Sequence, residues 1–297
     1  NVGNGSGVAS GRMDANTGKS WLLEGLMPYG GAAVAFNNNV PSQRVAPVDL
    51  AVSPQGKVLL AWVSGSVLWL ATRQADGTWG QAVQTTLTPT STTLKVVVND
   101  AGDGAIAYCT SGGANVVKLS AGSLQMSMPQ QISARCSTMV GYTGMGAQLA
   151  KAFDVAIDNT NSTIHAVGLM PSSSTAGKSQ VVWRQYVADT GWTAPEPISA
   201  ELASASFASS FSLSYSLAPA GHYAGVVWSQ SGEGGVSNAY VRLGEGGAWG
   251  EIKTLQSNSS APYVLPLIAV NDAGRAFAAM ALDDKSRSTH NMYVSNY

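Results

Sequence analysis

One pattern of apolar and polar positions returns five times along the chain. In each copy, an alternating apolar run leads into a turn rich in Asn, Asp, Pro and Gly, and a second apolar run follows. The copies are AVSPQGKVLLAW (51–62), VVNDAGDGAIAY (97–108), AIDNTNSTIHAV (156–167), SLAPAGHYAGVVW (216–228) and AVNDAGRAFAAM (269–280). Alternation with a period of two around a short turn indicates paired antiparallel strands, so each copy predicts a β-hairpin.

A third apolar stretch follows each hairpin, and a Gly-rich turn with a tryptophan follows most of these stretches. The third strands are expected at 66–73, 115–122, 180–187, 238–245 and 291–297. A short fourth strand then opens with Trp79, Trp192 or Trp249, whereas the second unit has Leu124 or Met126 at that place. One unit is therefore predicted to have four strands, and the units return about every 50 residues, a length typical of propeller blades.

Repeated four-stranded units predict an all-β fold, namely a single-domain, five-bladed β-propeller of antiparallel blades. The predicted blades cover 46–86, 94–133, 152–199, 210–256 and 263–297. The last unit ends without a fourth strand, and 20–27 contains an unmatched fourth strand that begins at Trp21. We therefore expect the N-terminal strand to complete the last blade and close the ring, because an open ring leaves an unprotected edge.

The repeated tryptophans have two interpretations. A large ring at the start of an outer strand can fill the wedge between blades that widens with distance from the axis, with its N–H bonded to the preceding turn. The other interpretation is a set of aromatic platforms for sugars. The structural interpretation is favoured because the tryptophans recur at the same place in the repeat.

The turn that precedes these tryptophans resembles a known motif. DGTW at 76–79 is similar to a short form of the Asp-box turn, S-x-D-x-G-x-x-W, of sialidases and other bacterial propeller repeats. DTGW at 189–192 and EGGAW at 245–249 are looser matches. The resemblance implies a secreted bacterial propeller of the sialidase or lectin type, in which the Asp box is a folding element away from the active site. It indicates a broad class of repeats and not one protein.

The composition of the chain indicates where the protein is located and which classes of partner it is expected to bind. The chain has 297 residues, a formal net charge of -1 and 11% charged residues, well below the roughly 25% of a typical soluble chain. No basic stripe indicates nucleic acid, and no apolar run approaches the about 18 residues of a membrane helix. The chain starts at Asn1 without a signal-like segment, so we expect a mature chain that is secreted, periplasmic or held at the cell surface. Its oligomeric state is not predicted.

The chain has two cysteines, Cys109 and Cys136. The low-charge composition is typical of extracellular proteins, which favours one disulfide over two buried thiols. The first cysteine ends the second strand of the second unit, and the other follows its fourth strand. The predicted bridge would close a loop of about 28 residues and would tie down the connection 134–151.

No motif for a metal ion, a nucleotide or a catalytic nucleophile is found in the sequence. The three histidines, His165, His222 and His290, lie in different units, and H-x-x-H, HExxH and CxxC patterns are missing. The stretch NDAGDG at 99–104 lacks the distal Glu of a calcium loop. Neither a nucleotide-binding glycine motif nor G-x-S-x-G occurs. We therefore expect no metal and no cofactor.

Polar residues interrupt the innermost strands at one equivalent position. Seven residues before the end of each hairpin turn stand Asp49, Lys95, Asp154, Ser214 and Leu267. Innermost strands of a propeller run in the same direction, so these residues should form a ring at one mouth of the central channel. Two hypotheses remain open: a salt-bridged plug that holds the blades in register, and a ligand site with perturbed charges.

Two long connections, 28–45 and 134–151, should lie at the same end of the ring. Long loops in compact domains are often functional. They contain the aromatic residues Tyr29, Phe36 and Tyr142, which are candidate ligand contacts beside Asp49, Lys95 and Asp154.

Three functions fit these features. The favoured one is a secreted propeller that binds carbohydrate or protein without turnover. The first alternative is a glycoside hydrolase with Asp49 and Asp154 as its carboxylate pair, about 5 to 10 Å apart, although no Glu occupies an equivalent inner position. A sialidase is not favoured, because Arg73, Arg184 and Arg242 lie on third strands and do not converge. The second alternative is a structural surface or assembly protein, and fold alone does not choose among the three.

Overall fold

The computed structural model describes residues 9–13, 21–25, 48–64, 66–90, 93–120, 123–140, 148–159, 161–188, 190–203, 214–217, 223–231, 237–259, 263–271, 273–284 and 289–296. Every regular element in these ranges is a β-strand. The prediction of an all-β fold is therefore confirmed. None of the described residues forms a helix long and apolar enough to cross a membrane.

The first two repeats form four-stranded antiparallel sheets. The first sheet contains β3 (Val48–Val52), β4 (Val58–Ser64), β5 (Val67–Arg73) and β6 (Val83–Gln84), in that spatial order. The second sheet contains β7 (Leu94–Val98), β8 (Gly104–Thr110), β9 (Gly113–Leu119) and β10 (Gln130–Ser133). Between the second and third sheets, β11 (Ser137–Val140) and β12 (Gln148–Lys151) form a separate hairpin.

The third and fourth sheets divide their outer strand into short pieces. The third sheet contains β13 (Phe153–Ile157), β14 (Ile164–Pro171) and β15 (Lys178–Val187), and β15 also pairs with β16 (Gly191–Trp192), β17 (Glu196–Pro197) and β18 (Leu202–Ala203). The fourth sheet contains β19 (Ser214–Leu217), β20 (Tyr223–Ser231) and β21 (Ser237–Glu245), with β22 (Ala248–Trp249) and β23 (Lys253–Ser259) along the outer edge.

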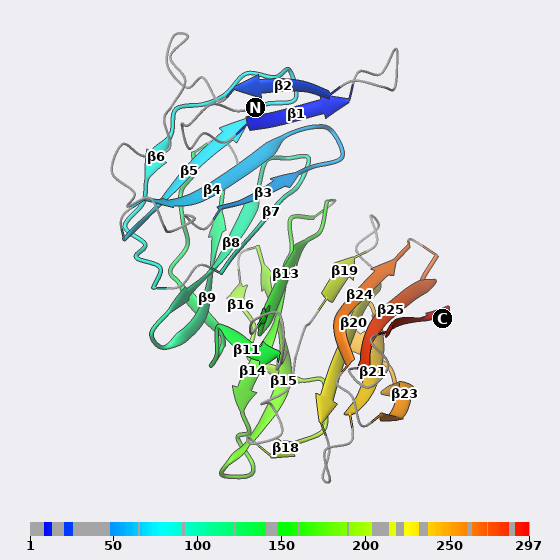
Figure 1. The fold of residues 1–297 in the computed structure, drawn as a ribbon. Coiled ribbons are helices and arrows are strands. Elements are labelled where there is room, and N and C mark those ends of the chain that lie inside the picture. The colour runs from blue at the N-terminus through cyan, green and yellow to red at the C-terminus, as the bar shows by residue number, and fades with distance from the viewer. Residues whose placement is uncertain are drawn as a thin grey trace.

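The fifth sheet has three described strands, β24 (Tyr263–Val270), β25 (Ala276–Asp284) and β26 (Thr289–Asn296). The predicted closing strand is not found beside β26. Instead, β2 (Trp21–Gly25) pairs along its length with β1 (Ala9–Met13) in a two-stranded sheet. Figure 1 shows β1 and β2 at the end of the molecule that holds β4 and β5, away from the red C-terminal strands. Closure of the last blade by the N-terminal strand is therefore not confirmed.

The hairpin turns explain why the repeats fold as they do. Gly102 N donates to the carbonyl of Asn99, and Asn99 N donates to the carbonyl of Asp103, at 3.0 and 2.9 Å. Gly102 has a φ of 91°, so the loop is a tight turn followed by a left-handed residue, a common three-residue hairpin connection. The Asn99 side chain accepts hydrogen bonds from the backbone of both Gly102 and Asp103. The turns at 53–57 and 271–275 repeat the backbone pattern.

The first strands of successive sheets lie against one another. β3 contacts β7, β7 contacts β13, β13 contacts β19, and β19 contacts β24, so the five sheets follow one another as the blades of a propeller do (Figure 1). The apolar core is divided among the interfaces between sheets. Leu59 and Leu70 of the first sheet pack with Ile106 and Leu119 of the second, and similar clusters join the later neighbours.

Trp192 and Trp249 pack in these interfaces, as the structural interpretation predicts, and Trp79 packs in an apolar cluster of the first sheet. Trp249 meets Trp183 of the third sheet edge to face, with 5.6 Å between ring centroids. Trp192 packs on the cluster between the second and third sheets. One detail of the expectation is wrong, because the indole N–H groups of Trp79 and Trp192 are buried and have no hydrogen-bond acceptor among the described residues. The packing of the ring, not its N–H group, explains why the motif is repeated.

Two arginines join neighbouring sheets beside those tryptophans. Arg184 Nε donates to the carbonyl of Thr193 in its own sheet at 2.9 Å, and its Nη1 donates to the carbonyl of Gln131 in the second sheet at 3.0 Å. Arg242 makes the same pair of bonds, to the carbonyls of Gly250 and Ile198. These two side chains therefore connect neighbouring sheets, and both donate their hydrogen bonds to backbone carbonyls.

Candidate functional site

The interface between the first and second sheets lacks the wedge tryptophan. In the first, third and fourth sheets, a tryptophan pairs with the end of the third strand, as Arg73 with Trp79, Tyr186 with Trp192 and Gly244 with Trp249. In the second sheet, the matching bridge joins Leu119 to Met126. Met126, rather than Leu124, therefore stands at the tryptophan position.

The bridging arginine is missing from the same interface. Arg184 and Arg242 lie two residues before the strand position that meets the tryptophan, and the matching residue of the second sheet is Val117. Val117 is buried in the cluster between the first and second sheets. The interface between the first and second sheets therefore has neither the tryptophan nor the arginine that the next two interfaces contain.

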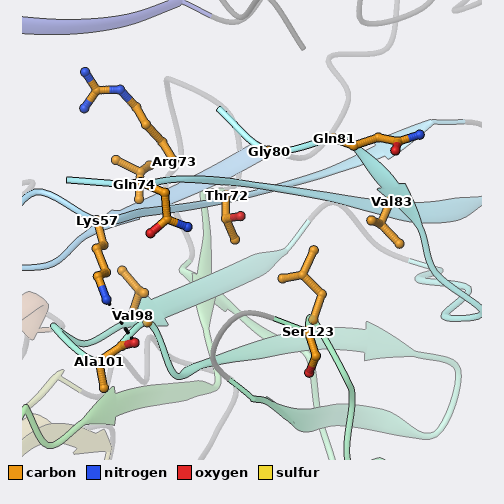
Figure 2. A pocket seen from close by; sticks show the side chains of 13 residues that line it. Lys57, Thr72, Arg73, Gln74, Gly80, Gln81, Val83, Val98, Ala101 and Ser123 are labelled. Carbon is orange, nitrogen blue, oxygen red and sulfur yellow. Dashed lines mark hydrogen bonds between the residues drawn. The ribbon is translucent and has the colours of Figure 1, made fainter. Parts of the chain in front are cut away.

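A cavity of about 540 Å³ lies at this interface. Its lining comes from both sheets, as Figure 2 shows, and the residues are Lys57, Val58, Thr72, Arg73, Gln74, Gly80, Gln81, Val83, Val98, Ala101, Gly102, Ser123 and Leu124. The volume is within the range of about 300 to 1,000 Å³ that is common for ligand sites. We name this the β5–β7 cavity, after the strands that contribute to its two sides.

The lining combines hydrogen-bonding and apolar side chains. Thr72 and Ser123 offer hydroxyl groups, and Gln74 and Gln81 offer amides that both donate and accept. Val83 is partly exposed on its side of the cavity. None of the thirteen residues drawn is an Asp, a Glu or a His. The cavity therefore has groups that bind a polar ligand, but it has no carboxyl or imidazole for proton transfer.

Of the two cations of the lining, Lys57 is bonded to the second sheet and Arg73 acts on Asp76 through its charge. Lys57 Nζ donates to the carbonyl of Ala101 in the second sheet at 3.0 Å (Figure 2). The backbone N–H of Thr78 donates to Asp76 at 2.8 Å and lowers the pKa of that carboxyl, with a smaller contribution from the charge of Arg73. Asp76 thus stabilises its own turn, as the resemblance to the Asp box implies.

The predicted inner-strand residues lie on three adjacent strands. Asp49 is on β3, Lys95 on β7 and Asp154 on β13, each the second residue of its strand. Val96 N donates to Asp49 Oδ2 at 2.8 Å, so this carboxylate links the first two sheets. Val155 N donates to Asp154 Oδ1 at 3.0 Å. The contact of Asp49 favours the structural hypothesis for that residue, and the role of all three in ligand binding stays a prediction.

The three aromatic candidates, Tyr29, Phe36 and Tyr142, lie outside the described residues. The β5–β7 cavity is at the opposite end of β3 from Asp49, because β3 runs from Asp49 towards the turn 53–57. The sequence patterns do not identify the residues that line the cavity. The available signal was the single unit in which Met126 or Leu124 replaces the tryptophan.

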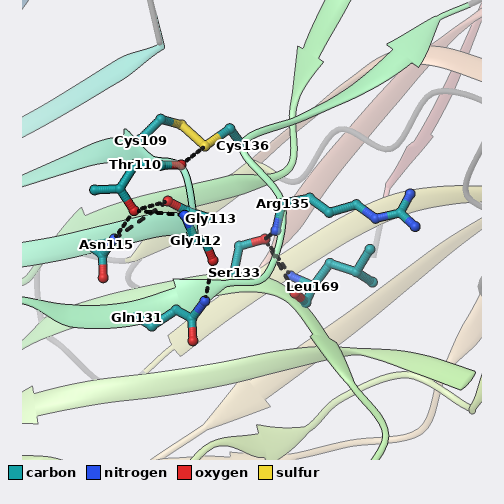
Figure 3. Close-up of a disulfide and its surroundings, with 10 residues drawn as sticks. All are labelled: Cys109, Thr110, Gly112, Gly113, Asn115, Gln131, Ser133, Arg135, Cys136 and Leu169. Carbon is teal, nitrogen blue, oxygen red and sulfur yellow. Dashed lines mark hydrogen bonds between the residues drawn. A yellow bond between two sulfur atoms is a disulfide. The ribbon is translucent and has the colours of Figure 1, made fainter. Parts of the chain in front are cut away.

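The predicted disulfide between Cys109 and Cys136 is confirmed, with a Cα–Cα distance of 5.6 Å. Cys109 lies near the end of β8, and Cys136 comes directly before β11 (Figure 3). Ala152 N, which follows β12, donates to the carbonyl of Cys136 at 3.2 Å. The bridge therefore anchors both ends of the β11–β12 hairpin to the second sheet.

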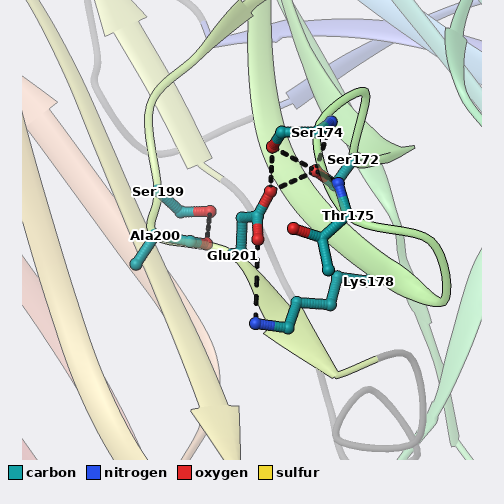
Figure 4. Close-up of polar contacts among 7 residues, drawn as sticks. All are labelled: Ser172, Ser174, Thr175, Lys178, Ser199, Ala200 and Glu201. Atoms are coloured by element: carbon teal, nitrogen blue, oxygen red, sulfur yellow. Dashed lines mark hydrogen bonds and ion pairs between the residues drawn. The ribbon is translucent and has the colours of Figure 1, made fainter.

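Glu201, which lies outside the cavity, is a carboxylate held by several hydrogen bonds. Its side chain accepts hydrogen bonds from Ser172 and Ser174, and Lys178 Nζ lies 3.7 Å from its Oε2 (Figure 4). The bonds from Ser172, Ser174 and Thr175 are the main reason that its pKa falls to about 2. Glu201 is ionised at neutral pH and has no proton to donate. In the described part of the chain, no three His, Cys, Asp or Glu side chains gather as metal ligands.

The arrangement of sheets identifies the fold class as that of β-propeller proteins, and comparison with solved structures agrees. An ulvan lyase of polysaccharide lyase family PL25, bound to -[GlcA(1-4)Rha3S]-, aligns with a TM-score of 0.51 at 11% identity over 83% of this chain and 67% of that chain. AofleA from Arthrobotrys oligospora aligns with a TM-score of 0.50 at 11% identity over 94% and 73%.

No protein-family model matches the sequence, and a search of curated proteins finds no match. At the identities of the solved structures, the likeness concerns the fold alone. Function therefore has to be argued from the residues of this chain.

Proposed function

We propose that this chain is a secreted or cell-surface β-propeller that binds carbohydrate in the β5–β7 cavity without cleaving it. The observation that carries the proposal is the coincidence of three features at one interface. The wedge tryptophan is replaced by Met126, the bridging arginine is replaced by Val117, and a cavity of about 540 Å³ is present. The disulfide supports an oxidising location.

The lining suits a sugar. Hydroxyl groups of a sugar both donate and accept, as do the amides of Gln74 and Gln81 and the hydroxyl of Thr72. The C–H groups of a pyranose form apolar patches, which match Val98 and Leu124 on the other side of the cavity. The ulvan lyase that shares the fold has a uronate and sulfated rhamnose unit bound, which supports carbohydrate as the ligand class.

The absence of carboxylates from the lining supports binding over hydrolysis. Glycoside hydrolysis usually needs a pair of Asp or Glu residues, one of which protonates the leaving oxygen. The thirteen lining residues provide neither member of such a pair. Asp49 and Asp154, the pair of the hydrolase alternative, lie on strands β3 and β13 with β7 between them.

The test introduces a tryptophan at the interface that lacks one. Met126→Trp places an indole where Trp192 and Trp249 stand in their sheets. Met126 itself does not line the cavity, but Leu124, two residues before it, does, and we expect the larger ring to extend into the cavity beside Leu124. We expect wild-type protein to bind at least one glycan on an array, and we expect Met126→Trp to weaken that binding about tenfold or more in calorimetric titration, the effect of losing about 1.4 kcal/mol. The variant should melt no lower than wild type.

The matched control is Met128→Trp, the same change two residues along the chain at a side chain that is 86% exposed. It should bind like wild type. If Met126→Trp binds the glycan like wild type, the glycan does not bind in the β5–β7 cavity. Asp49→Asn would then test the other end of β3 as the binding site. Release of reducing ends would favour the hydrolase. Failure of wild type to bind any glycan would leave the protein-binding or structural alternative.

A further inference from the structure

Large apolar side chains are exposed on β3 of the first sheet and on β25 of the fifth sheet, the two sheets at the ends of the series. In the first sheet, Leu50 and Val52 of β3 are 38% and 58% exposed. In the fifth sheet, Phe277 of β25 is 47% exposed. The exposure of Leu50 and Phe277 needs an explanation, because the other described sheets bury the equivalent positions.

The register identifies the equivalent residues in the other sheets. The equivalents of Leu50 are Val96 and Val155, which are 2% and 1% exposed. The equivalents of Phe277, each opposite the same inner-strand position, are buried: they are Leu59, Ala105, His165 and Gly225. Only the sheets at the two ends of the series expose these positions among the described residues.

The exposed side chains point away from the neighbouring sheets. Ala51 packs in the cluster with the second sheet, so Leu50 and Val52, which alternate with it, lie on the opposite face of β3. Ala278 packs against the fourth sheet, so Phe277 lies on the opposite face of β25. The first and fifth sheets therefore each have one apolar face without a described partner sheet.

We propose that the N-terminal hairpin β1–β2 is an additional blade that packs between these two faces and completes the ring. The segment 1–47 directly precedes β3 and is about as long as one repeat. Its described part is an antiparallel sheet, and β2 begins with Trp21, while β16 and β22 at the outer edges of the third and fourth sheets each contain a tryptophan. Figure 1 shows β1–β2 at the end of the molecule that holds the first sheet.

This arrangement replaces the predicted one, in which a single N-terminal strand completes the fifth blade. The repeats supply five blades, and the N-terminal hairpin supplies a sixth. The sheet face of Leu50 and Val52 then packs on one side of the hairpin, and the face of Phe277 packs on the other. This proposal does not depend on the proposed carbohydrate site.

A distance measurement tests the arrangement in the full-length chain. Spin labels are placed on Val52→Cys and Phe277→Cys, while Cys109 and Cys136 stay joined in their disulfide. Packed sheets lie about 10 Å apart, so one intervening sheet predicts about 20 Å between the labelled faces. A distance of about 10 Å would mean direct contact of the two terminal sheets, and one above about 30 Å would mean an open ring. Either would overturn the proposal.

Dilution with an excess of unlabelled chain distinguishes a second copy from the hairpin. The distance should persist on dilution, and its loss would assign the two faces to contacts between molecules and overturn the proposal. A second pair of variants is independent of labelling. Leu50→Asp should lower the melting temperature by about 5 °C or more, because it buries a charge.

Ile252→Asp is the matched control, because Ile252 is 40% exposed, nearly the same as Leu50, and lies outside both terminal faces. Its melting temperature should change by less than about 2 °C. Equal effects of the two substitutions would show that the face of Leu50 is solvated and would overturn the proposal.

Discussion

Protonation of the buried His165 is expected to limit stability in mild acid. His165 is on β14 and is 6% exposed. Its Nδ1 accepts the indole N–H of Trp183 at 3.2 Å, with 5.7 Å between the ring centroids. An imidazole whose Nδ1 accepts a hydrogen bond is neutral, because the protonated ring has only donors. Acid must therefore break this contact to charge the ring.

The magnitude follows from the pKa. Burial lowers the pKa of His165 from 6.5 to about 4, and the negative charge of Asp158 offsets part of this effect. Between these values the unfolded chain binds a proton that the folded chain does not bind. The free energy of unfolding should therefore be unaffected by this group above pH 6.5 and should fall as the pH drops towards 4. At about 1.4 kcal/mol per pH unit, the total loss is about 3 kcal/mol.

The assay compares wild type with His165→Gln by urea denaturation from pH 8 to pH 4. Glutamine keeps an acceptor for the Trp183 N–H but does not titrate. Both proteins share all other acid-sensitive groups, so the difference between their free energies of unfolding isolates the histidine. We expect that difference to shift by about 3 kcal/mol in favour of the variant across this range. Parallel curves would refute the assignment of a neutral, buried imidazole.

Two further predictions concern the links between elements. Replacing Cys109 and Cys136 by alanine should lower the free energy of unfolding by about 3 kcal/mol through loop-closure entropy, and equal urea midpoints for both proteins would contradict this. Arg242→Met should cost about 1 to 3 kcal/mol of unfolding free energy because two backbone carbonyls lose a charged donor. The control Arg275→Met, at an exposed residue that ends the turn 271–275, should cost less than about 0.5 kcal/mol in the same denaturation.

The strands and their hairpins were predictable because alternation and turn chemistry are local. The turn glycines inferred from sequence, such as Gly56 and Gly102, have the positive φ that the hairpin connection needs. The disulfide was predictable as well, because the chain contains one possible pair. The recurrent Trp192 and Trp249 could be assigned to packing because they return in the same part of the repeat.

The pairing of β2 was not predictable from the same patterns. Sequence analysis matched Trp21 with the far end of the chain, whereas the structure pairs β2 with β1, which is separated from it only by residues 14–20. The closer partner costs less loop-closure entropy. The stretch ASGRM of β1 has little apolar alternation, so nothing in its pattern indicated a strand.

The β5–β7 cavity escaped prediction for a different reason. Its lining includes Gln81 from the first sheet and Ser123 from the second, and no local pattern relates these residues. Their proximity depends on the contact of β3 with β7, which brings two repeats together. A site between repeats is therefore visible in sequence only through a departure from the repeat.

That departure is informative because the repeat provides its own standard of comparison. Two consecutive interfaces combine a tryptophan that fills the wedge with an arginine that joins the sheets. The first sheet has Trp79 but Ala71 at the position of the arginine, so it departs from this pair at one position only. At the interface of the first and second sheets both Val117 and Met126 depart from the pattern, and a cavity with polar side chains in its lining lies at the same interface. Natural sequences break their own local rules mostly where function requires it, and this reasoning selects the β5–β7 cavity over the inner-strand position.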